Sequence, residues 1–244
     1  MKRSPLVSLK KDCKEKLEGQ KLQAILSKRR RAYLTNLIYR EYLALHRALN
    51  KFPLLSSRAD KKKYGGYKRS YELFCVQLEN ALSSLKNPVQ IELIPFPKNQ
   101  EINLWEDYRD DLLDTQKDNV RKIAQYEKDG FLIILQILDT VERLQGLSFP
   151  IIGSRGKDYK KAMEKLQKRT NEAGQTILNA LNRRKIKEIP LNPGIYPPIE
   201  TTRIISRNDK QTTDEIIISR VNEKGYTWKT SLLRKAAVEV ITRA

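Results

Sequence analysis

Side chains that could perform covalent chemistry are few in this chain. The sequence has one histidine, His46, and two cysteines, Cys13 and Cys75, which stand far apart. Nucleophilic and acid–base catalysis usually pair a histidine with a nucleophile or a carboxylate, whereas His46 falls between Leu45 and Leu49 of a helical pattern. We therefore expect the chain not to be an enzyme, and these residue types predict no metal site, disulfide or cofactor.

Two short segments contain residues that could contact phosphates. The sequence GSRGK, residues 153–157, lacks the GxxxxGK[ST] spacing and a preceding strand, so we expect no nucleotide there. The sequence KKKYGGYKRSY, residues 61–71, surrounds a flexible Gly-Gly pair with cations and tyrosines. It predicts a loop that contacts phosphates and stacks nucleic-acid bases, or else a solvated connection between two helices. The candidate residues are Lys61, Lys62, Lys63, Tyr64, Tyr67, Lys68 and Arg69.

The charge of the chain is uneven along its length. The net charge is +19, and residues 1–100 hold 22 Lys and Arg against 8 Asp and Glu. Such an excess favours an anionic partner, namely nucleic acid, a lipid surface or an acidic protein face; a lysine-rich helical surface that serves solubility is the alternative. A further basic cluster is SKRRR, residues 27–31. The sequence shows no signal peptide and no apolar run of membrane-spanning length, so we expect a cytoplasmic protein without a membrane span.

The elements that position these residues are mostly helical. Helix formers with apolar residues near a 3.6-residue period predict a helix from about 14 to 52, ended by Pro53. A second apolar stripe from Tyr71 to Leu85 predicts a partner helix, and the two would form a basic helical hairpin in an N-terminal region, residues 1–100. The proline-containing piece from 87 to 100 is predicted to be a linker with some β character.

The second half of the chain begins with a long helix. Its apolar seam predicts a helix from about 103 to 144, too long for a compact domain to cover, so we expect a partner helix from a second copy and a homodimer. A second seam predicts a helix from 158 to about 185. Together they form a dimerisation region, residues 101–190. After four prolines, β-branched segments predict a small β domain, residues 191–244.

The order of these parts, and three motifs within it, resemble a known family. The motifs are ILQILDTVERL at 134–144, NRRKIKEI at 182–189 and KGYTWKTSLLRKAAVEV at 224–240. Residues 105–244 resemble the GrpE family, nucleotide exchange factors of the bacterial chaperone DnaK. The chain differs from the usual family pattern at Gln136, Thr230, Ser231 and Lys235.

The resemblance implies a function without bond-making chemistry. It implies a mostly α, GrpE-like dimer whose C-terminal β domain binds the nucleotide-binding domain of a DnaK-type chaperone and stabilises its open cleft, so that ADP leaves faster. By resemblance, the contact residues are Lys224, Gly225, Tyr226, Arg234 and Val240. From the residues alone, the alternative is that Gly225 provides a turn, Tyr226 and Val240 form core, and Lys224 and Arg234 are ordinary surface cations. Trp228 would either anchor an interface or cap the small core, and we favour the core. The alternative function is a nucleic-acid-binding dimer that uses the basic hairpin.

Overall fold

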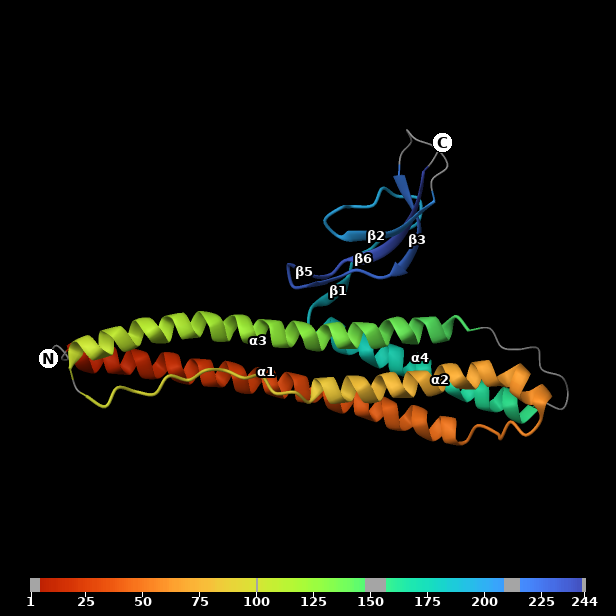
Figure 1. Ribbon diagram of the computed structural model, residues 1–244, viewed down its shortest axis with the longest axis horizontal. Coiled ribbons are helices and arrows are strands. Elements are labelled where there is room, and N and C mark those ends of the chain that lie inside the picture. The colour runs from red at the N-terminus through yellow and green to blue at the C-terminus, as the bar shows by residue number, and fades with distance from the viewer. Residues whose placement is uncertain (1–4, 100, 148–156, 209–215, 243–244) are drawn as a thin grey trace. The chain divides into compact units, whose positions relative to one another are not determined.

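The computed structural model describes residues 5–99, 101–147, 157–208 and 216–242 (Figure 1). Within these ranges the chain is predominantly helical, with a small C-terminal β region, which confirms the coarse fold class predicted from the sequence. No helix among the described residues is both long enough and apolar enough to cross a bilayer. The helices are α1 (Pro5–Asn50), α2 (Arg58–Leu85), α3 (Ile102–Gln145) and α4 (Lys157–Arg183).

Contacts between residues divide the chain into two compact units. Unit 1 consists of Met1–Tyr39 and Asn80–Gly130, and unit 2 consists of Arg40–Glu79 and Phe131–Ala244. Helices α1, α2 and α3 each contribute residues to both units. The boundaries of the two units differ from the domain boundaries predicted at residues 100 and 190. Those domain boundaries remain predictions.

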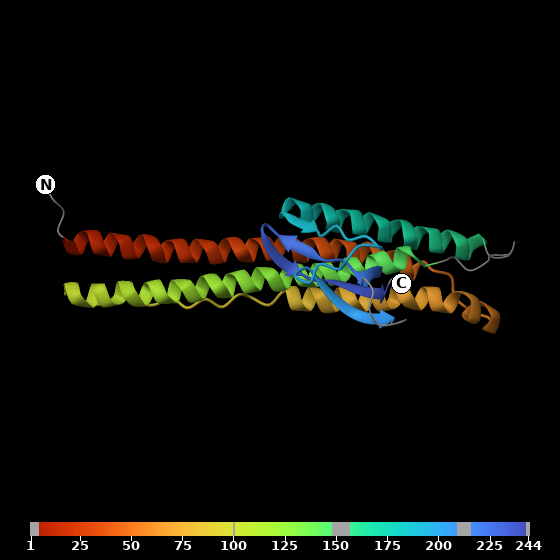
Figure 2. The ribbon, with the colours of Figure 1, turned by 90° about the horizontal axis from the view of Figure 1, so that it is seen from above.

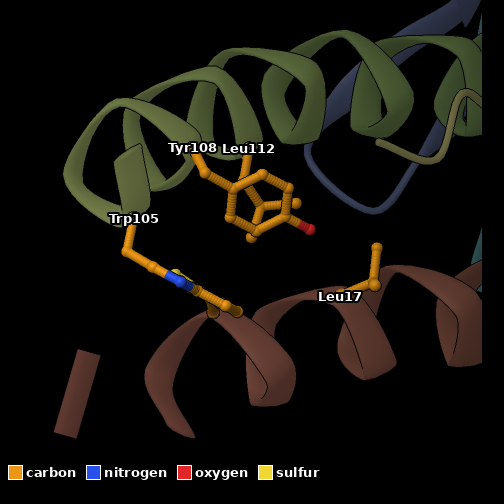
Figure 3. Close-up of a cluster of buried hydrophobic side chains, with 5 residues drawn as sticks. Leu17, Trp105, Tyr108 and Leu112 are labelled. Atoms are coloured by element: carbon orange, nitrogen blue, oxygen red, sulfur yellow. The ribbon is translucent and has the colours of Figure 1, made fainter. Parts of the chain in front are cut away.

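In unit 1, α1 and α3 lie side by side and run in the same direction (Figures 1 and 2). Cys13 and Leu17 of α1 form a buried cluster with Trp105, Tyr108 and Leu112 of α3, and their side chains fill the space between the helices (Figure 3). The predicted seam of α3 therefore has a partner helix in unit 1, and that helix belongs to the same chain.

A buried polar contact accompanies this apolar packing. Asn119 of α3 donates through Nδ2 to Gln20 Oε1 of α1 at 3.0 Å and to the Glu92 carbonyl at 2.7 Å. Its Oδ1 accepts the Glu92 amide at 2.9 Å. Buried polar groups of this kind fix the register of two helices, because any other register leaves them without partners. Residues 88–98, predicted as a linker with β character, form no strand in the structure.

The second helix begins earlier than the sequence pattern predicted. Ser57 caps its start, because the Ser57 Oγ accepts the Asp60 amide at 3.0 Å and donates to the Asp60 carboxylate at 2.7 Å. Tyr64, Tyr67 and Tyr71 then continue the buried stripe one helical turn after another. Residues 61–70 are therefore helical, and the prediction of a flexible loop was wrong. Burial of the tyrosines offsets the low helix propensity of the Gly-Gly pair.

Replacing Gly66 by alanine is expected to stabilise the protein. A Cβ at Gly66 meets nothing within 4 Å, and its backbone is helical without a positive φ, so alanine should raise the free energy of unfolding by about 0.5–1 kcal/mol. Urea denaturation of the full chain measures the change. Gly174→Ala is the matched control within α4, because its Cβ would lie 2.8 Å from Val141 Cγ1 and should lower stability. Loss of stability in Gly66→Ala would contradict the helical assignment.

All four helices contribute to the core of unit 2. Leu45 of α1, Leu78 of α2, Ile137 of α3 and Ile177 of α4 line one small internal hollow. Each of these side chains is buried. The predicted helical pair at the N-terminus thus packs, in unit 2, against the end of α3 and against α4.

The β region follows α4 and contains two small sheets. Its strands are β1 (Ile186–Glu188), β2 (Thr202–Asn208), β3 (Ile216–Glu223), β4 (Tyr226–Trp228), β5 (Ser231–Arg234) and β6 (Ala236–Thr242). One sheet has the order β1-β4-β5 and is antiparallel; the other has the order β2-β6-β3, with β2 parallel to β6. The segments predicted as strands became β2, β3 and β6, whereas β1, β4 and β5 were missed.

Candidate partner interface

Arg234, one of the residues implied by the resemblance, joins the sheet β1-β4-β5 to the end of α3. Its guanidinium contacts the Asp139 carboxylate through two hydrogen bonds, of 2.5 and 2.8 Å. It also donates to the Lys224 carbonyl at 3.0 and 2.8 Å. The side chains of Arg234 and Asp139 are only 15% and 17% exposed, so this bidentate pair is largely shielded from water.

Lys224 makes a second set of ion pairs at the same place. Its ammonium group lies 3.0 Å from the Glu142 carboxylate of α3 and 3.1 Å from the Glu188 carboxylate of β1. Partial burial opposes the charged form, but hydrogen bonds to the two carboxylates outweigh it and raise the pKa of Lys224. Lys224 and Arg234 therefore both anchor the β region to α3.

Two aromatic side chains of β4 also make contacts in this part of unit 2. Tyr226 is 2% exposed, and the Arg234 guanidinium lies 5.4 Å from its ring centroid. Burial is the main cause that raises the pKa of Tyr226. The Trp228 ring packs edge-on against Phe131 of α3, with centroids 5.0 Å apart. Trp228 thus packs on a helix, where the sequence predicted that it would cap the small β core.

Gly225 is required by close packing, not by a turn. Its φ lies outside the positive range, and the positive φ between β4 and β5 belongs to Lys229, at 57°. A Cβ on Gly225 would lie 2.9 Å from the Ala236 amide nitrogen and 3.0 Å from Ile189 Cδ1. The predicted turn at Gly225 was therefore wrong.

Replacing Gly225 by alanine is expected to lower the free energy of unfolding by about 1–3 kcal/mol, because the added methyl group overpacks a backbone contact. Urea denaturation checks the value. Gly194→Ala tests a different cause, since its Cβ meets nothing within 4 Å and its φ is 90°, so any loss there comes from backbone strain alone. An unchanged midpoint for Gly225→Ala would contradict the packing argument.

Val240 lies in the other sheet. It is 1% exposed and forms a buried cluster with Ile218, Ala236 and Val238. The structure therefore brings Lys224, Gly225, Tyr226 and Arg234 together and places Val240 apart from them. All five are buried or ion-paired, so their direct role is to hold the β region together and to position it on α3.

Several apolar side chains that sequence analysis did not single out are exposed in the β region. The most exposed is Ile199, at 75%. Ile204 and Ile205 are neighbours in β2 and are 48% and 47% exposed. Adjacent isoleucines in a strand point to opposite faces, so a single core cannot bury both, and this is the signal that could have found them. The exposed apolar residues of the region are Ile195, Tyr196, Ile199, Ile204, Ile205, Leu232 and Ile241.

The tyrosines predicted to stack nucleic-acid bases contact residues of α4 instead. Tyr64 stacks on Tyr159 of α4 with centroids 4.4 Å apart, and Tyr67 donates to the Met163 carbonyl at 3.4 Å. Both side chains are buried, so the prediction of base stacking was wrong. Lys61, Lys62, Lys63 and Arg69 are exposed on α2, and Lys68 lies 3.5 Å from the Glu72 carboxylate.

A group of cations in unit 2 comes from segments far apart in the sequence. Arg47 near the end of α1, Lys51 just after α1, and Lys165 and Arg169 of α4 line a hollow of about 240 Å³, together with Ala44 and Ala48. We call this the basic furrow. Arg169 also contacts the Glu172 carboxylate at 2.6 Å. Sequence analysis missed the furrow because each segment contributes only two of its cations.

The SKRRR cluster contains one arginine that faces inward. Arg31 is 7% exposed and donates to the carbonyls of Leu85 at 3.2 Å, Ser84 at 2.9 Å and Tyr126 at 2.7 Å. Its guanidinium also lies 3.9 Å from the Tyr126 ring centroid. Burial is the main cause that lowers the pKa of Arg31. Arg31 thus caps the C-terminal end of α2 within unit 1.

The remaining candidates for chemistry are isolated. His46 Nδ1 lies 3.3 Å from the Asn50 amide and its ring packs on Tyr42. Cys13 and Cys75 are free thiols, and burial raises the pKa of Cys75 to about 11. Among the described residues no three His, Cys, Asp or Glu side chains gather in a way that could hold a metal ion. Of the GSRGK segment, residues 153–156 lie outside the described residues.

No protein-family model matches the chain, and no curated protein matches it. The comparisons therefore indicate no enzyme family, and they add no residue assignments to those made from the geometry.

Proposed function

We propose that this protein is a GrpE-like co-chaperone that promotes ADP release from a DnaK-type chaperone. The observation that carries the proposal is the attachment of a small β region to the end of a long helix through Arg234 and Lys224, residues of the motif that resembles the GrpE family. We place this activity in the cytoplasm, following the sequence.

The function requires a β region held in a fixed orientation. A chaperone lobe that binds such a region in the open form, and less well in the closed form, shifts toward the open form and loses contacts to ADP. The exposed apolar residues around Ile199 and Ile204 are the contact surface in this proposal, because a buried Tyr226 and Val240 cannot reach a partner. The ion pairs at Asp139 and Glu142 supply the rigidity.

The test measures release of a fluorescent ADP from a DnaK-type chaperone by stopped flow. The wild-type chain should accelerate release, and Ile199→Asp with Ile204→Asp should abolish the acceleration. Val7→Asp, a change of the same kind at a residue of α1 that is 54% exposed, is the matched control and should keep full activity. Wild-type protein without effect on several chaperones would reject the proposal.

A second candidate function is binding of a nucleic-acid strand in the basic furrow. Four cations that line one hollow favour phosphate contacts, and this observation replaces the tyrosine loop predicted from the sequence. Arg47→Glu with Lys51→Glu should weaken binding to single-stranded DNA and reduce its salt dependence. Lys61→Glu with Lys62→Glu, a charge change of equal size on α2, is the control. Equal loss in both variants would indicate a general effect of charge and reject the furrow.

A further inference from the structure

We propose that α1 and α2 are an internal counterpart of α3 and α4, so that one chain supplies both halves of the helical scaffold and works as a monomer. The homodimer expected from the sequence rested on the uncovered seam of α3. In unit 1 that seam is covered by α1. The proposal replaces the second copy by the N-terminal helices of the same chain.

The first support is the repetition of helix lengths and positions. α1 has 46 residues and α3 has 44; α2 has 28 and α4 has 27. α1 begins at residue 5 and α3 at 102, and α2 begins at residue 58 and α4 at 157. In each pair, a long helix is followed by a shorter one, and the separation in sequence between their first residues is nearly the same. The second pair repeats the first after a shift of 97 to 99 residues.

The second support is the spacing of the contacts. In unit 1, α1 meets α3 through residues 95, 97 and 99 positions apart, namely Arg31 with Tyr126, Arg30 with Glu127 and Gln20 with Asn119. In unit 2, α2 meets α4 through Tyr67 and Met163, which are 96 positions apart. Equivalent positions therefore face each other in both pairs. A parallel two-fold dimer produces this pattern between copies, and here it occurs within one chain.

The buried positions repeat with the same spacing. Ile38 of α1 and Ile134 of α3 are 96 positions apart, and both are fully buried. Phe74 of α2 and Thr170 of α4 have the same spacing and are 2% and 0% exposed. Further buried pairs at a spacing of 96 are Leu45 and Val141, Ala48 and Leu144, Tyr67 and Met163, Ala81 and Ile177, and Leu85 and Leu181. The two helix pairs therefore bury side chains at equivalent positions.

The polar contacts favour pairing of α1 with α3 over pairing of two α3 helices. Asn119 faces Gln20, and Glu127 accepts Arg30 Nη1 at 2.7 Å. Two parallel α3 helices in register would place Glu127 beside Glu127, a like-charge contact, and would remove the guanidinium that neutralises it. The Glu127 side chain is only 9% exposed, so the loss would not be relieved by water. These contacts select the intramolecular partner.

A consequence for the partner rests on the proposed function. In the described residues a β region follows α4 and none follows α2, where residues 88–98 form no strand. A monomer would then present a single β region and engage one chaperone molecule, whereas a homodimer would present two.

The test uses the full chain and two readouts. Sedimentation equilibrium of the wild type over micromolar concentrations should give the mass of one chain. In an Arg30→Cys, Glu127→Cys variant, a short bifunctional thiol reagent should join the two cysteines within one chain, as read by denaturing gel and peptide mapping. The native cysteines are buried, and the single variant Arg30→Cys, which cannot form an internal link, is the control.

The possible outcomes distinguish a monomer from an association of two chains. A monomer with internal cross-links supports the proposal. A dimer of the wild type overturns it, whether the cross-links fall within or between chains. Links that join two chains at the lowest concentration also overturn it, since they show that α1 pairs with another copy. Neither readout involves a chaperone, so failure of the ADP-release assay would not affect the conclusion about the monomer. The one-to-one complex with a chaperone is tested only if that assay succeeds.

Discussion

Replacing Arg234 by alanine is expected to free the β region from α3. The substitution removes two hydrogen bonds to Asp139 and two to the Lys224 carbonyl, and leaves the Asp139 carboxylate largely buried without its cation. Breaking a buried pair in this way lowers the free energy of unfolding by about 3–5 kcal/mol. Hydrogen exchange measured by mass spectrometry should rise in β4, β5 and the last turns of α3, while exchange in unit 1 stays unchanged.

Arg203→Ala is the matched control for this change. Arg203 belongs to the same β region and lies 3.5 Å from the Glu223 carboxylate, but the two side chains are 63% and 46% exposed. Exposed pairs contribute little, so its exchange pattern should resemble that of the wild type. The double variant Arg234→Met, Asp139→Leu should recover part of the lost stability, because it removes both charges together. Equal exchange in Arg234→Ala and Arg203→Ala would mean that the bidentate pair does not hold the region.

The same variants separate anchoring from partner contact in the proposed exchange function. If Arg234 acts by positioning the β region, Arg234→Ala should reduce ADP release, and the Met–Leu double variant should restore it in part. A residue that touches the chaperone directly would not be rescued by a second change at Asp139. This distinction matters because sequence resemblance alone places Arg234, Tyr226 and Gly225 at the partner, whereas their burial and pairing place them inside the protein.

The helices and the main strands could be predicted from the sequence because their signals are local. The apolar period of α3 and α4 and the β-branched runs of β2, β3 and β6 each lie within one element. The start of α2 was missed because Gly65 and Gly66 outweighed the cap formed by Ser57 and Asp60. A Gly-Gly pair lowers helix propensity, but three buried tyrosines at helical spacing decide the conformation in the folded chain.

The candidate site was less predictable because its residues act across long separations. The motif around Lys224 and Arg234 identified important positions. The carboxylates of Glu142 and Asp139, with which these two cations form ion pairs, belong to another segment. The pairing of α1 with α3 was also hidden, since a seam shows that a helix needs a partner and does not show which helix it is. The contacts of Gln20 and Asn119 supply that information only in three dimensions.

Replacing Arg31 by methionine should destabilise unit 1 strongly. Methionine keeps an unbranched apolar stem of the side chain, but it removes every hydrogen bond to the carbonyls of Ser84, Leu85 and Tyr126. Two of these carbonyls belong to the last turn of α2, where no intrahelical donor is available. Leaving buried carbonyls without donors costs about 1–3 kcal/mol each, so we expect a loss of about 3–5 kcal/mol in the free energy of unfolding, since such costs are not fully additive. Urea denaturation followed by circular dichroism measures it.

Arg29→Met is the matched control, because Arg29 lies two residues earlier on α1 and is exposed. It removes the same charge from the same helix, so a purely electrostatic role of the SKRRR cluster would make the two variants alike. We expect the Arg29 variant to keep the wild-type midpoint and the Arg31 variant to lose cooperativity in unit 1. Since Arg31 holds the end of α2 beside α3, its loss should also weaken the pairing of α1 with α3. Internal cross-linking between positions 30 and 127 should then fall in the Arg31→Met background and persist in the Arg29→Met background.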